Sequence, residues 1–400
     1  MTWTKIVPVL LRTALGLVGT ACALAQAVPT AGPDFSGHAA WVYDSLNLPG
    51  KARQVQPGFF VAAINDYNSK AQRGHQIEAI YNYHGSMEMY CQNGPLQNCS
   101  ADKLTLSFAT PRGKSGRHAT GSSVARYRQG LKNGDNQQRL KAIAIIDGVV
   151  NGQYEGSLKG FNELPQNLAE GFADKVTASI CDDPNIDGVQ FDLEPIDIET
   201  QNGQYFFYRR ISENFAGDRE IDGINCVTDS HPVGRFFSVF APVRALRPGS
   251  DSAAHMHEIT NAHRNGYMIA PIYDLDGSPL GHATPVGQYQ QMALRQLQQL
   301  NEWASQAKVA FKVGIPAAAS VHEYVRCEGP PCRNHRAAPD SQLAYVQAVI
   351  NAQSESGIRD NTLFLGNAIW AWSRGISHGG ARFLPESPPT EVLNYLAEHL

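Results

Sequence analysis

Hydrophobic and polar positions alternate strictly over residues 188–194. The polar set on one side of an extended chain is Gly188, Gln190, Asp192 and Glu194. The apolar set on the other side is Val189, Phe191 and Leu193. Because successive side chains of a strand point to opposite faces, this pattern predicts a strand whose apolar face packs on other elements. Pro195 cannot donate a backbone hydrogen bond, so we expect the strand to end before it.

Apolar strand-like runs and helical segments recur along the rest of the chain. Besides the segment 186–194, strands are expected at 76–84, 104–109, 140–146, 236–243, 267–273, 308–315 and 363–372. Helices are expected at 165–180, 205–215, 286–307, 341–352 and 390–399. Eight strands with helices between several of them predict an α/β protein with a (β/α)8 TIM barrel. The pattern is weakest at the short connection between the first two strands and at the helix after the fifth.

In such a barrel, the polar side of residues 188–194 faces the interior and the apolar side faces the helices. Asp192 and Glu194 then stand at the carboxyl end of a strand, where barrel enzymes carry their catalytic groups. Their Cα atoms are about 6–7 Å apart at the rise of a strand. An edge strand with solvated acids would show the same alternation, but the large, continuous apolar side argues against that interpretation.

Residues 1–25 have the features of a secretory signal peptide. Lys5 and Arg12 supply positive charge, and the segment contains a largely apolar stretch. A small-x-small cleavage site ends at Ala25, with cleavage after Ala27 as an alternative. We therefore expect a secreted protein, either extracellular or periplasmic.

The composition is that of a globular protein, with 42% hydrophobic and 18% charged residues. Residues 26–74 show little periodicity and are expected to form a lead-in that wraps the core of the barrel catalytic domain at 75–400. The formal net charge of −4 becomes −6 without residues 1–25, because that segment holds two basic residues and no acidic one. This charge disfavours nucleic acid or an anionic membrane as a partner. No later apolar run is long enough to span a membrane.

Six cysteines remain when Cys22 in the signal segment is set aside, and an even number in an exported chain indicates disulfides. The short-range pairs Cys91–Cys99 and Cys327–Cys332 are favoured, which leaves Cys181–Cys226, although other connectivities stay open. A zinc site is not expected, because the chain has no Cys-x-x-Cys pair.

The segment from Asp187 to Glu194 resembles the active-site strand of glycoside hydrolase family 18, which holds chitinases and endo-β-N-acetylglucosaminidases. That strand reads Asp-Gly-x-Asp-x-Asp-x-Glu, and the matching residues here are Asp187, Gly188, Asp192 and Glu194. Gln190 replaces the middle Asp. Residues 271–274 resemble the family's Met-x-Tyr-Asp, with Pro in the Met position, whereas its Ser-x-Gly-Gly is not evident at 145–148. Trp370 fits the family's tryptophan at the end of the eighth strand, with Trp372 as an alternative.

The resemblance implies a hydrolase that cleaves β-linked N-acetylglucosamine in glycans such as chitin oligomers or N-glycans. Cleavage would retain the anomeric configuration, because the nucleophile is the carbonyl oxygen of the substrate's own 2-acetamido group. Glu194 would be the general acid and then the base, and Asp192 would hold the acetamido N–H and stabilise the developing positive charge. Tyr273 would donate its hydroxyl proton to the acetamido carbonyl, and Trp370 would stack under the sugar ring.

Three further residues are expected near the substrate, namely Gln190, Asp274 and Tyr81. Gln190 cannot ionise, but its amide N–H can bond Asp192 and favour the charged form of that acid. A satisfied polar residue of the barrel interior is the alternative interpretation of Gln190. Tyr81 could line a sugar groove or pack in the core. Asp187 is out of phase with the inward row and is expected to be structural.

We expect a monomer without cofactor or metal, whose partner is an oligo- or polysaccharide containing N-acetylglucosamine. A metal site at His255, His257 and His263 is disfavoured, because His-x-His follows the fifth strand here and lies on the first strand in barrel amidohydrolases. The main alternative is a non-catalytic, family-18-like barrel that binds carbohydrate or acts as an inhibitor. Such members commonly lose the acid at the position of Glu194, so its presence beside Asp192 favours an enzyme.

Overall fold

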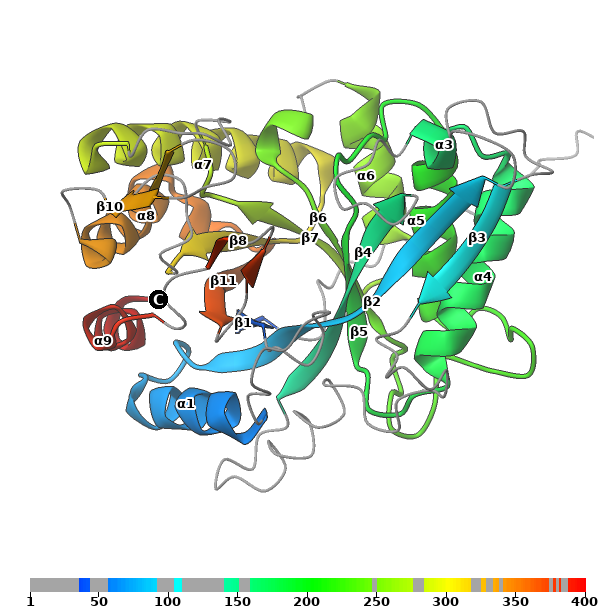
Figure 1. Ribbon diagram of the computed structural model, residues 1–400, viewed down its shortest axis with the longest axis horizontal. Coiled ribbons are helices and arrows are strands. Elements are labelled where there is room, and N and C mark those ends of the chain that lie inside the picture. The colour runs from blue at the N-terminus through cyan, green and yellow to red at the C-terminus, as the bar shows by residue number, and fades with distance from the viewer. Residues whose placement is uncertain are drawn as a thin grey trace, which may run out of the picture.

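The protein is an α/β barrel, as predicted from the sequence (Figure 1). The computed structural model describes residues 36–43, 57–91, 104–109, 140–150, 159–246, 250–275, 284–317, 325–328, 334–337, 341–373, 377–378, 381–382 and 388–400. Eight of the described strands run parallel and form a closed ring, with helices on its outside. This is the (β/α)8 TIM-barrel architecture.

The ring is closed by the pairing of its first two strands in the sequence. Its strands are β1 (His38–Tyr43), β2 (Ile77–Cys91), β4 (Lys141–Val150), β5 (Gly188–Asp192), β6 (Phe236–Phe240), β7 (Gly266–Pro271), β8 (Phe311–Pro316) and β11 (Phe364–Ser373). Around the ring the order is β1, β11, β8, β7, β6, β5, β4 and β2, and β2 pairs again with β1. In this order β11 lies opposite β5, which places the ends of these two strands across the barrel mouth from each other.

Helices follow or precede most strands of the ring. They are α1 (Pro57–Lys70), α3 (Lys159–Asn162), α4 (Gln166–Cys181), α5 (Gly203–Phe215), α6 (Asp251–Asn261), α7 (Val286–Ala307), α8 (Gln342–Ser356) and α9 (Thr390–His399). The five predicted helices correspond to α4, α5, α7, α8 and α9, and α7 has the predicted bounds. The helices α1, α6 and the four-residue α3 were not predicted from the sequence. In α6 the residues His255, His257 and Asn261 are weak helix formers, which hides the apolar spacing.

The first barrel strand differs from the prediction. The segment 104–109, expected as the second barrel strand, is β3 (Leu104–Ala109), which pairs antiparallel with the outer part of β2 and lies outside the ring. The ring takes β1 instead, from the segment that the sequence analysis placed before the barrel. Residues 39–42 are buried on both sides of β1, so the strand has no polar alternation that could mark it.

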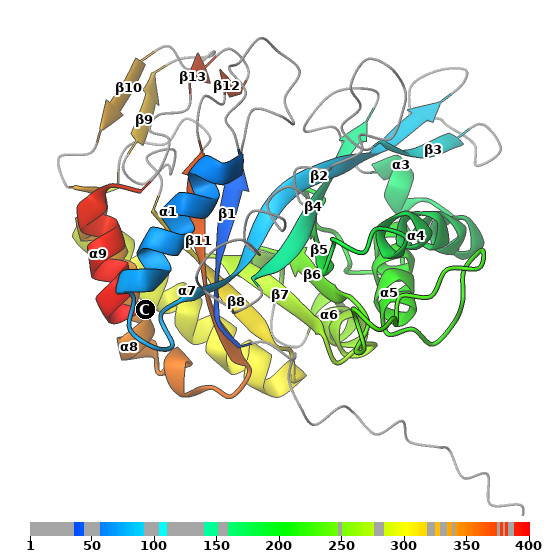
Figure 2. The same cartoon turned by 90° about the horizontal axis from the view of Figure 1, so that it is seen from below.

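Short two-stranded additions stand at the end of the barrel to which the strands point (Figure 2). They are the hairpins β9 (Val325–Glu328) with β10 (Asn334–Ala337) and β12 (Ser377–His378) with β13 (Ala381–Arg382). The β2–β3 ribbon projects from the same end. The carboxyl ends of the strands therefore form the elaborated face of the molecule, where barrel proteins place their sites.

Residues 188–194 alternate because the side chains of β5 point in turn to the helices outside the barrel and to the barrel interior. Val189, Phe191 and Leu193 belong to the layer between strands and helices, where the ring centroid of Phe191 is 5.4 Å from that of Phe207 on α5. Gln190 and Asp192 consequently face the barrel interior. Gly188 begins the strand, and a Cβ there would collide with the carbonyl oxygen of Phe236, so this close approach of β5 and β6 requires glycine.

Asp187 connects the amino-terminal end of β5 to neighbouring segments through buried hydrogen bonds. This agrees with the structural role expected for it. Its side chain is buried, and one carboxylate oxygen accepts a hydrogen bond from the backbone N–H of Ala142 at 2.8 Å. The other oxygen lies 3.1 Å from Nε2 of the buried His231. The carboxylate thus joins β4, β5 and the segment before β6 at the end of the barrel away from the mouth.

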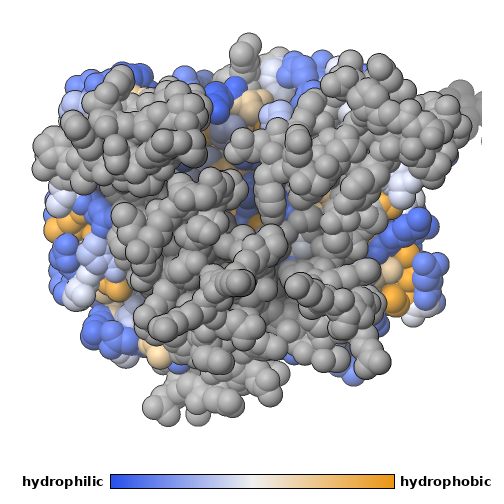
Figure 3. All heavy atoms as spheres, viewed as in Figure 1, coloured by the Kyte–Doolittle hydropathy of each residue, from blue (hydrophilic) through white to orange (hydrophobic). Residues whose placement is uncertain are grey.

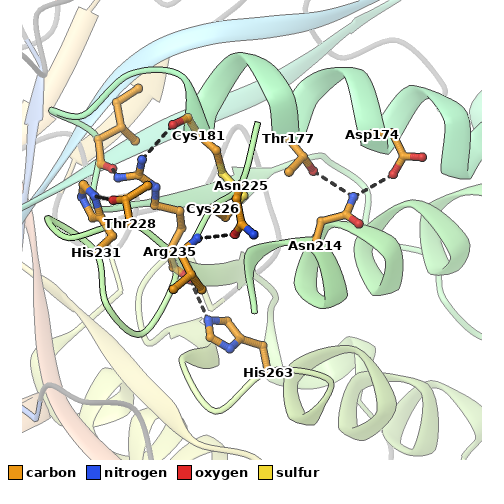
Figure 4. The surroundings of a disulfide bond; sticks show 12 residues. Asp174, Thr177, Cys181, Asn214, Asn225, Cys226, Thr228, His231, Arg235 and His263 are labelled. Atoms are coloured by element: carbon orange, nitrogen blue, oxygen red, sulfur yellow. Dashed lines mark hydrogen bonds between the residues drawn. A yellow bond between two sulfur atoms is a disulfide. The ribbon is translucent and has the colours of Figure 1, made fainter. Parts of the chain in front are cut away.

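Cys181 and Cys226 form a disulfide, which confirms this predicted pair (Figure 4). Buried hydrogen bonds around it connect the same part of the fold. The buried guanidinium of Arg235 donates to the carbonyl oxygen of Cys181 at 2.9 Å and to that of Ile186 at 2.6 Å. His263 lies 2.9 Å from the carbonyl oxygen of Arg235 itself. These contacts tie the end of α4 and the start of β5 to β6.

Other predictions fall on residues outside the described part of the chain. They concern the signal segment 1–25 and the pairs Cys91–Cys99 and Cys327–Cys332, since Cys99 and Cys332 are not described. Within the described ranges, no helix is both long and apolar enough to cross a membrane. The described surface visible in Figure 3 is largely hydrophilic, with isolated apolar spots.

We predict that Asp187→Ala destabilises the fold. The substitution leaves the backbone N–H of Ala142 and the ring of His231 without their carboxylate partner, and each buried polar group left unpaired costs about 1–3 kcal/mol. Urea unfolding should therefore show a lower free energy of unfolding. Asp182→Ala, at an exposed neighbouring position, is the control and should change stability by less than about 0.5 kcal/mol. Equal free energies of unfolding for the two variants would contradict a stabilising role of the Asp187 side chain.

Candidate active site

Three carboxylates gather at the carboxyl ends of β4 and β5. Asp192 ends β5 and is half-buried, and Glu194 follows two residues later with an exposed side chain. In the parallel register of β4 and β5, Asp147 pairs with Asp192. Earlier interior positions of β4, Ile143 and Ile145, belong to the cluster inside the barrel, so Asp147 has the same orientation as Asp192.

The crowding of acids affects the protonation of Asp192. Burial raises the pKa of Asp192 from 3.8 to about 8, with further contributions from the negative charges of Glu194 and Asp147. Asp192 forms no hydrogen bond to any described residue that would offset this effect. At neutral pH the folded protein therefore holds a proton on Asp192 for most of the time.

Gln190 does not bond Asp192, contrary to the prediction from the sequence. Its amide oxygen accepts a hydrogen bond from the indole N–H of Trp41 on β1 at 2.7 Å, and both side chains are about 1% exposed. The pKa of Asp192 accordingly moves upwards, whereas the expected bond would have favoured the charged form. The amide oxygen of Gln190 is thus satisfied inside the barrel, and its predicted contact with a substrate stays a prediction.

Aromatic rings from several other strands also lie at the mouth of the barrel. Trp370 lies on β11, and its ring stacks beside that of Tyr273 with centroids 5.6 Å apart and planes at 28°. Trp41 meets Trp370 edge-on at 5.5 Å and Phe240 at 6.3 Å. The half-buried Trp370 is thereby held between Trp41 and Tyr273, while β11 places it across the barrel from β5.

A cavity of about 150 Å³ brings three of the predicted site residues together. Glu194, Tyr273 and Asp274 line it, along with Phe240 and Arg244. Asp274 has a φ of 55°, a left-handed conformation that Asp adopts more readily than most residues. The cavity therefore combines an exposed carboxylate from the end of β5 with a tyrosine from the end of β7.

A second cavity, of about 250 Å³, lies beside the first. Asp197, Glu199 and Ser252 contribute to its lining, and Arg244 lines both cavities. Arg244 is exposed and has no hydrogen bond or ion pair with the described residues. The two cavities thus extend from Tyr273 past Glu194 to the loops that follow β5 and β6, with a cation at their junction.

Tyr81 lines neither cavity and packs in the core, which was the alternative to its predicted place in a sugar groove. Its side chain is fully buried, its hydroxyl lies 3.0 Å from that of Tyr267, and its ring centroid is 5.2 Å from that of Trp41. Burial raises the pKa of both tyrosines. Tyr81 belongs to the core of the barrel and supports Trp41 from below the mouth.

The three histidines considered for a metal site do not converge. His255 Nδ1 is 2.7 Å from the carbonyl oxygen of Ile198, and His263 Nε2 contacts the carbonyl oxygen of Arg235. His257 contacts a different carbonyl, at the end of α7. No group of three or more metal-ligating side chains occurs in the described portion of the chain.

Sequence reasoning missed two residues of this site, Trp41 and Asp147. Trp41 lies in a strand without alternation, and its role depends on the pairing of β1 with β11. Asp147 lies just beyond the strand predicted at 140–146, but β4 continues to Val150. The inward phase of Ile143, Ile145 and Asp147 was the available signal.

Comparisons with known proteins yield structural similarity only. No protein-family model matches the chain, and no curated protein matches its sequence. The crystal structure of the spore cortex-lytic enzyme SleL of Bacillus megaterium QM B1551 has 10% identity and a TM-score of 0.47, covering 92% of this chain and 74% of that one. An endo-β-1,4-glucanase of Xanthomonas axonopodis pv. citri has 11% identity and a TM-score of 0.46, covering 90% and 99%.

A xylanase–α-amylase inhibitor protein, crystallised with trehalose, is also similar to this chain. Its identity is 9% and its TM-score is 0.41, with coverage of 84% of this chain and 93% of that one. Similarities of this extent carry no argument about activity.

We predict that Asp192 makes stability depend on pH in a specific direction. Its raised pKa means that between pH 4 and pH 8 the folded chain binds a proton that the unfolded chain releases. The stabilising contribution of this protonation is complete below the unfolded pKa and is lost as the pH rises towards 8. The wild type should therefore lose stability relative to Asp192→Asn across this range, as measured by urea unfolding at several pH values. A difference between the two proteins that stays constant with pH would contradict the shifted pKa.

Proposed function

We propose that this protein is a glycosidase that cleaves β-linked N-acetylglucosamine in glycans by a retaining, substrate-assisted mechanism. The observation that carries the proposal is the pair Asp192 and Glu194 at the carboxyl end of β5, which shares the barrel mouth with the stacked rings of Tyr273 and Trp370. Carboxyl groups supply the proton transfer that sugar cleavage requires, and an aromatic surface suits the binding of a sugar ring.

We assign to Glu194 the role of the general acid. Its exposed side chain lines the first cavity, where it can reach the oxygen between two sugars. It donates a proton to that oxygen as the bond to the anomeric carbon breaks. In the second step it accepts a proton from the water that attacks the same carbon.

Asp192 lies next to Glu194, deeper in the barrel mouth. We assign to it the acetamido N–H of the substrate, which its carboxyl oxygens can accept because they form no hydrogen bond with the described residues. The acetamido carbonyl oxygen then attacks the anomeric carbon, and a positive charge develops on the acetamido group. A carboxylate beside that charge lowers the energy of the transition state.

Tyr273 and Trp370 form the sugar-binding side of the mouth. The hydroxyl of Tyr273 is assigned to the acetamido carbonyl, which it orients for attack. The ring of Trp370 offers apolar area to the C–H face of the sugar. Its contacts with Trp41 and Tyr273 fix the orientation of the ring before the substrate binds.

The cavity beyond Glu194 indicates the direction of the substrate chain. The sugar that is attacked lies on the side of Trp370, so the leaving group extends past Glu194 towards Arg244. Arg244 and the carboxylates of Asp197 and Glu199 offer hydrogen-bonding groups suited to sugar hydroxyls. This arrangement favours cleavage within a chain, with more than one sugar on the leaving side.

The alternative function is a non-catalytic barrel that binds a glycan or a protein. It shares the aromatic surface and the cavities with the proposed enzyme, but it does not need the acids of β5. Incubation of the purified protein with chitin oligomers, N-glycans and peptidoglycan fragments distinguishes the two. Binding without cleavage of any of them would favour the alternative. Export, expected from the signal features of residues 1–25, is a proposal that fractionation of cells would test.

We predict that Glu194→Gln abolishes turnover and keeps the affinity for glycan. The change is nearly isosteric and removes the titratable proton, and general acid catalysis contributes about 10²–10⁴-fold to a rate. Asp192→Asn should lower kcat less, and Asp187→Asn should act mostly on stability. Glu398→Gln, exposed on α9, is the matched control and should keep the wild-type rate. A near-normal rate for Glu194→Gln would exclude the proposed mechanism.

A further inference from the structure

A buried hydrogen bond crosses the interior of the barrel between β1 and β5. The indole N–H of Trp41 donates to the amide oxygen of Gln190 at 2.7 Å, and both side chains are about 1% exposed. On one side of the ring, β2 and β4 stand between these two strands, so their backbones do not pair with each other. The two side chains therefore supply a direct connection between β1 and β5 that the sheet itself does not provide.

The chemistry of this pair suits the apolar interior around it. Gln190 pairs in register with Ile145 on β4 and Ser238 on β6. Ile145 and Trp41 belong to the same hydrophobic cluster inside the barrel. An amide oxygen accepts the indole proton without adding a charge on the face of β5 that carries Asp192. Trp41 forms no other hydrogen bond with the described residues, and a buried N–H without an acceptor is unfavourable, so the bond fixes the orientation of its ring.

The ring of Trp41 contacts two rings that reach the mouth of the barrel. Its centroid is 5.5 Å from that of Trp370, with planes at 67°, and 6.3 Å from that of Phe240, with planes at 81°. Such edge-to-face pairs depend on the relative orientation of the rings. Trp370 is half-buried and stacks beside Tyr273, and Phe240 lines the first cavity. A change in the orientation of Trp41 therefore changes the support of both rings.

We propose that Gln190 is a positioning residue for sugar binding, which acts through Trp41 on Trp370. The inference rests on the proposed function, in which Trp370 stacks on the sugar ring. The amide oxygen of Gln190 holds the indole of Trp41, and Trp41 in turn fixes the ring plane of Trp370 before the substrate binds. Gln190 replaces the middle Asp of the resembling family strand, so this position here supports aromatic rings and carries no titratable proton.

Two substitutions break the bond from its two ends. Gln190→Leu removes the acceptor, and Trp41→Phe removes the donor. With a tetramer of β-linked N-acetylglucosamine as substrate, we expect each to raise KM about 2–10-fold, the size of one aromatic contact, and to change kcat less than KM. The double variant should be no worse than Trp41→Phe alone, because the bond is already absent there. Trp41→Phe also tests the bond if Gln190→Leu does not fold.

Gln190→Glu and Trp303→Phe are the matched controls. Glu keeps an oxygen for the indole N–H, so KM should stay near the wild-type value, although an added acid near Asp192 changes the pH profile of kcat. Trp303 is a buried tryptophan of α7 whose indole N–H has no hydrogen-bond partner among the described residues, so Trp303→Phe should leave KM unchanged. A KM as high in Gln190→Glu as in Gln190→Leu would contradict the role of Gln190 as the acceptor.

NMR of the free protein with isotope-labelled tryptophan gives a readout that is independent of activity. The indole proton of Trp41 should exchange slowly with solvent in the wild type and faster in Gln190→Leu. The indole signal of Trp370 should shift in the same variant, because the effect passes through Trp41. An unchanged Trp370 signal, or an unchanged KM, would overturn the inference and leave the proposed function standing. A wild type that neither binds nor cleaves the tetramer would refute the proposed function instead, and the Trp370 signal would still decide whether Gln190 positions this ring.

Discussion

The division of β5 between two environments is the constraint on which the site depends. Phe191 and its apolar neighbours are buried against helices, so Gln190 and Asp192 must face the barrel interior. A slip of one residue would exchange the two faces, burying carboxylates among the rings of α5. The buried contacts of Asp187 with Ala142 and His231 hold the strand in register at the far end. Packing at one end of the barrel thereby determines where the acids lie at the other.

The placement of carboxylates together at the barrel mouth is electrostatically unfavourable. Three carboxylates at neighbouring strand ends repel one another, and Asp192 holds a proton that an exposed aspartate would release. Such local conflicts are typical of functional sites, because a group with a shifted pKa is ready to exchange a proton near neutral pH. The buried hydrogen bond between Trp41 and Gln190 involves no charge, and it links β5 to the aromatic rings beside β1.

The barrel fold and the positions of Asp192 and Glu194 on β5 could be predicted from patterns within single segments. Features that depend on pairing between distant strands could not be predicted in this way. The alternation of β5 and the spacing of α7 are visible within single segments, and both appear in the structure. The role of Asp147 depends on the register between β4 and β5, which no single segment contains. β1 was missed because a strand buried on both faces has no alternation. The burial of Tyr81 could not be foreseen, because it depends on Trp41 and Tyr267 from strands distant in the sequence.

The central claim is that the substrate's own acetamido group is the nucleophile while Glu194 transfers protons. The anomeric configuration of the first product formed from a β-linked N-acetylglucosamine oligomer, observed by NMR before mutarotation, tests this claim most directly. Substrate assistance predicts that the β-anomer appears first, because two displacements at the same carbon retain its configuration. Appearance of the α-anomer as the first product would show direct attack by water and contradict the mechanism.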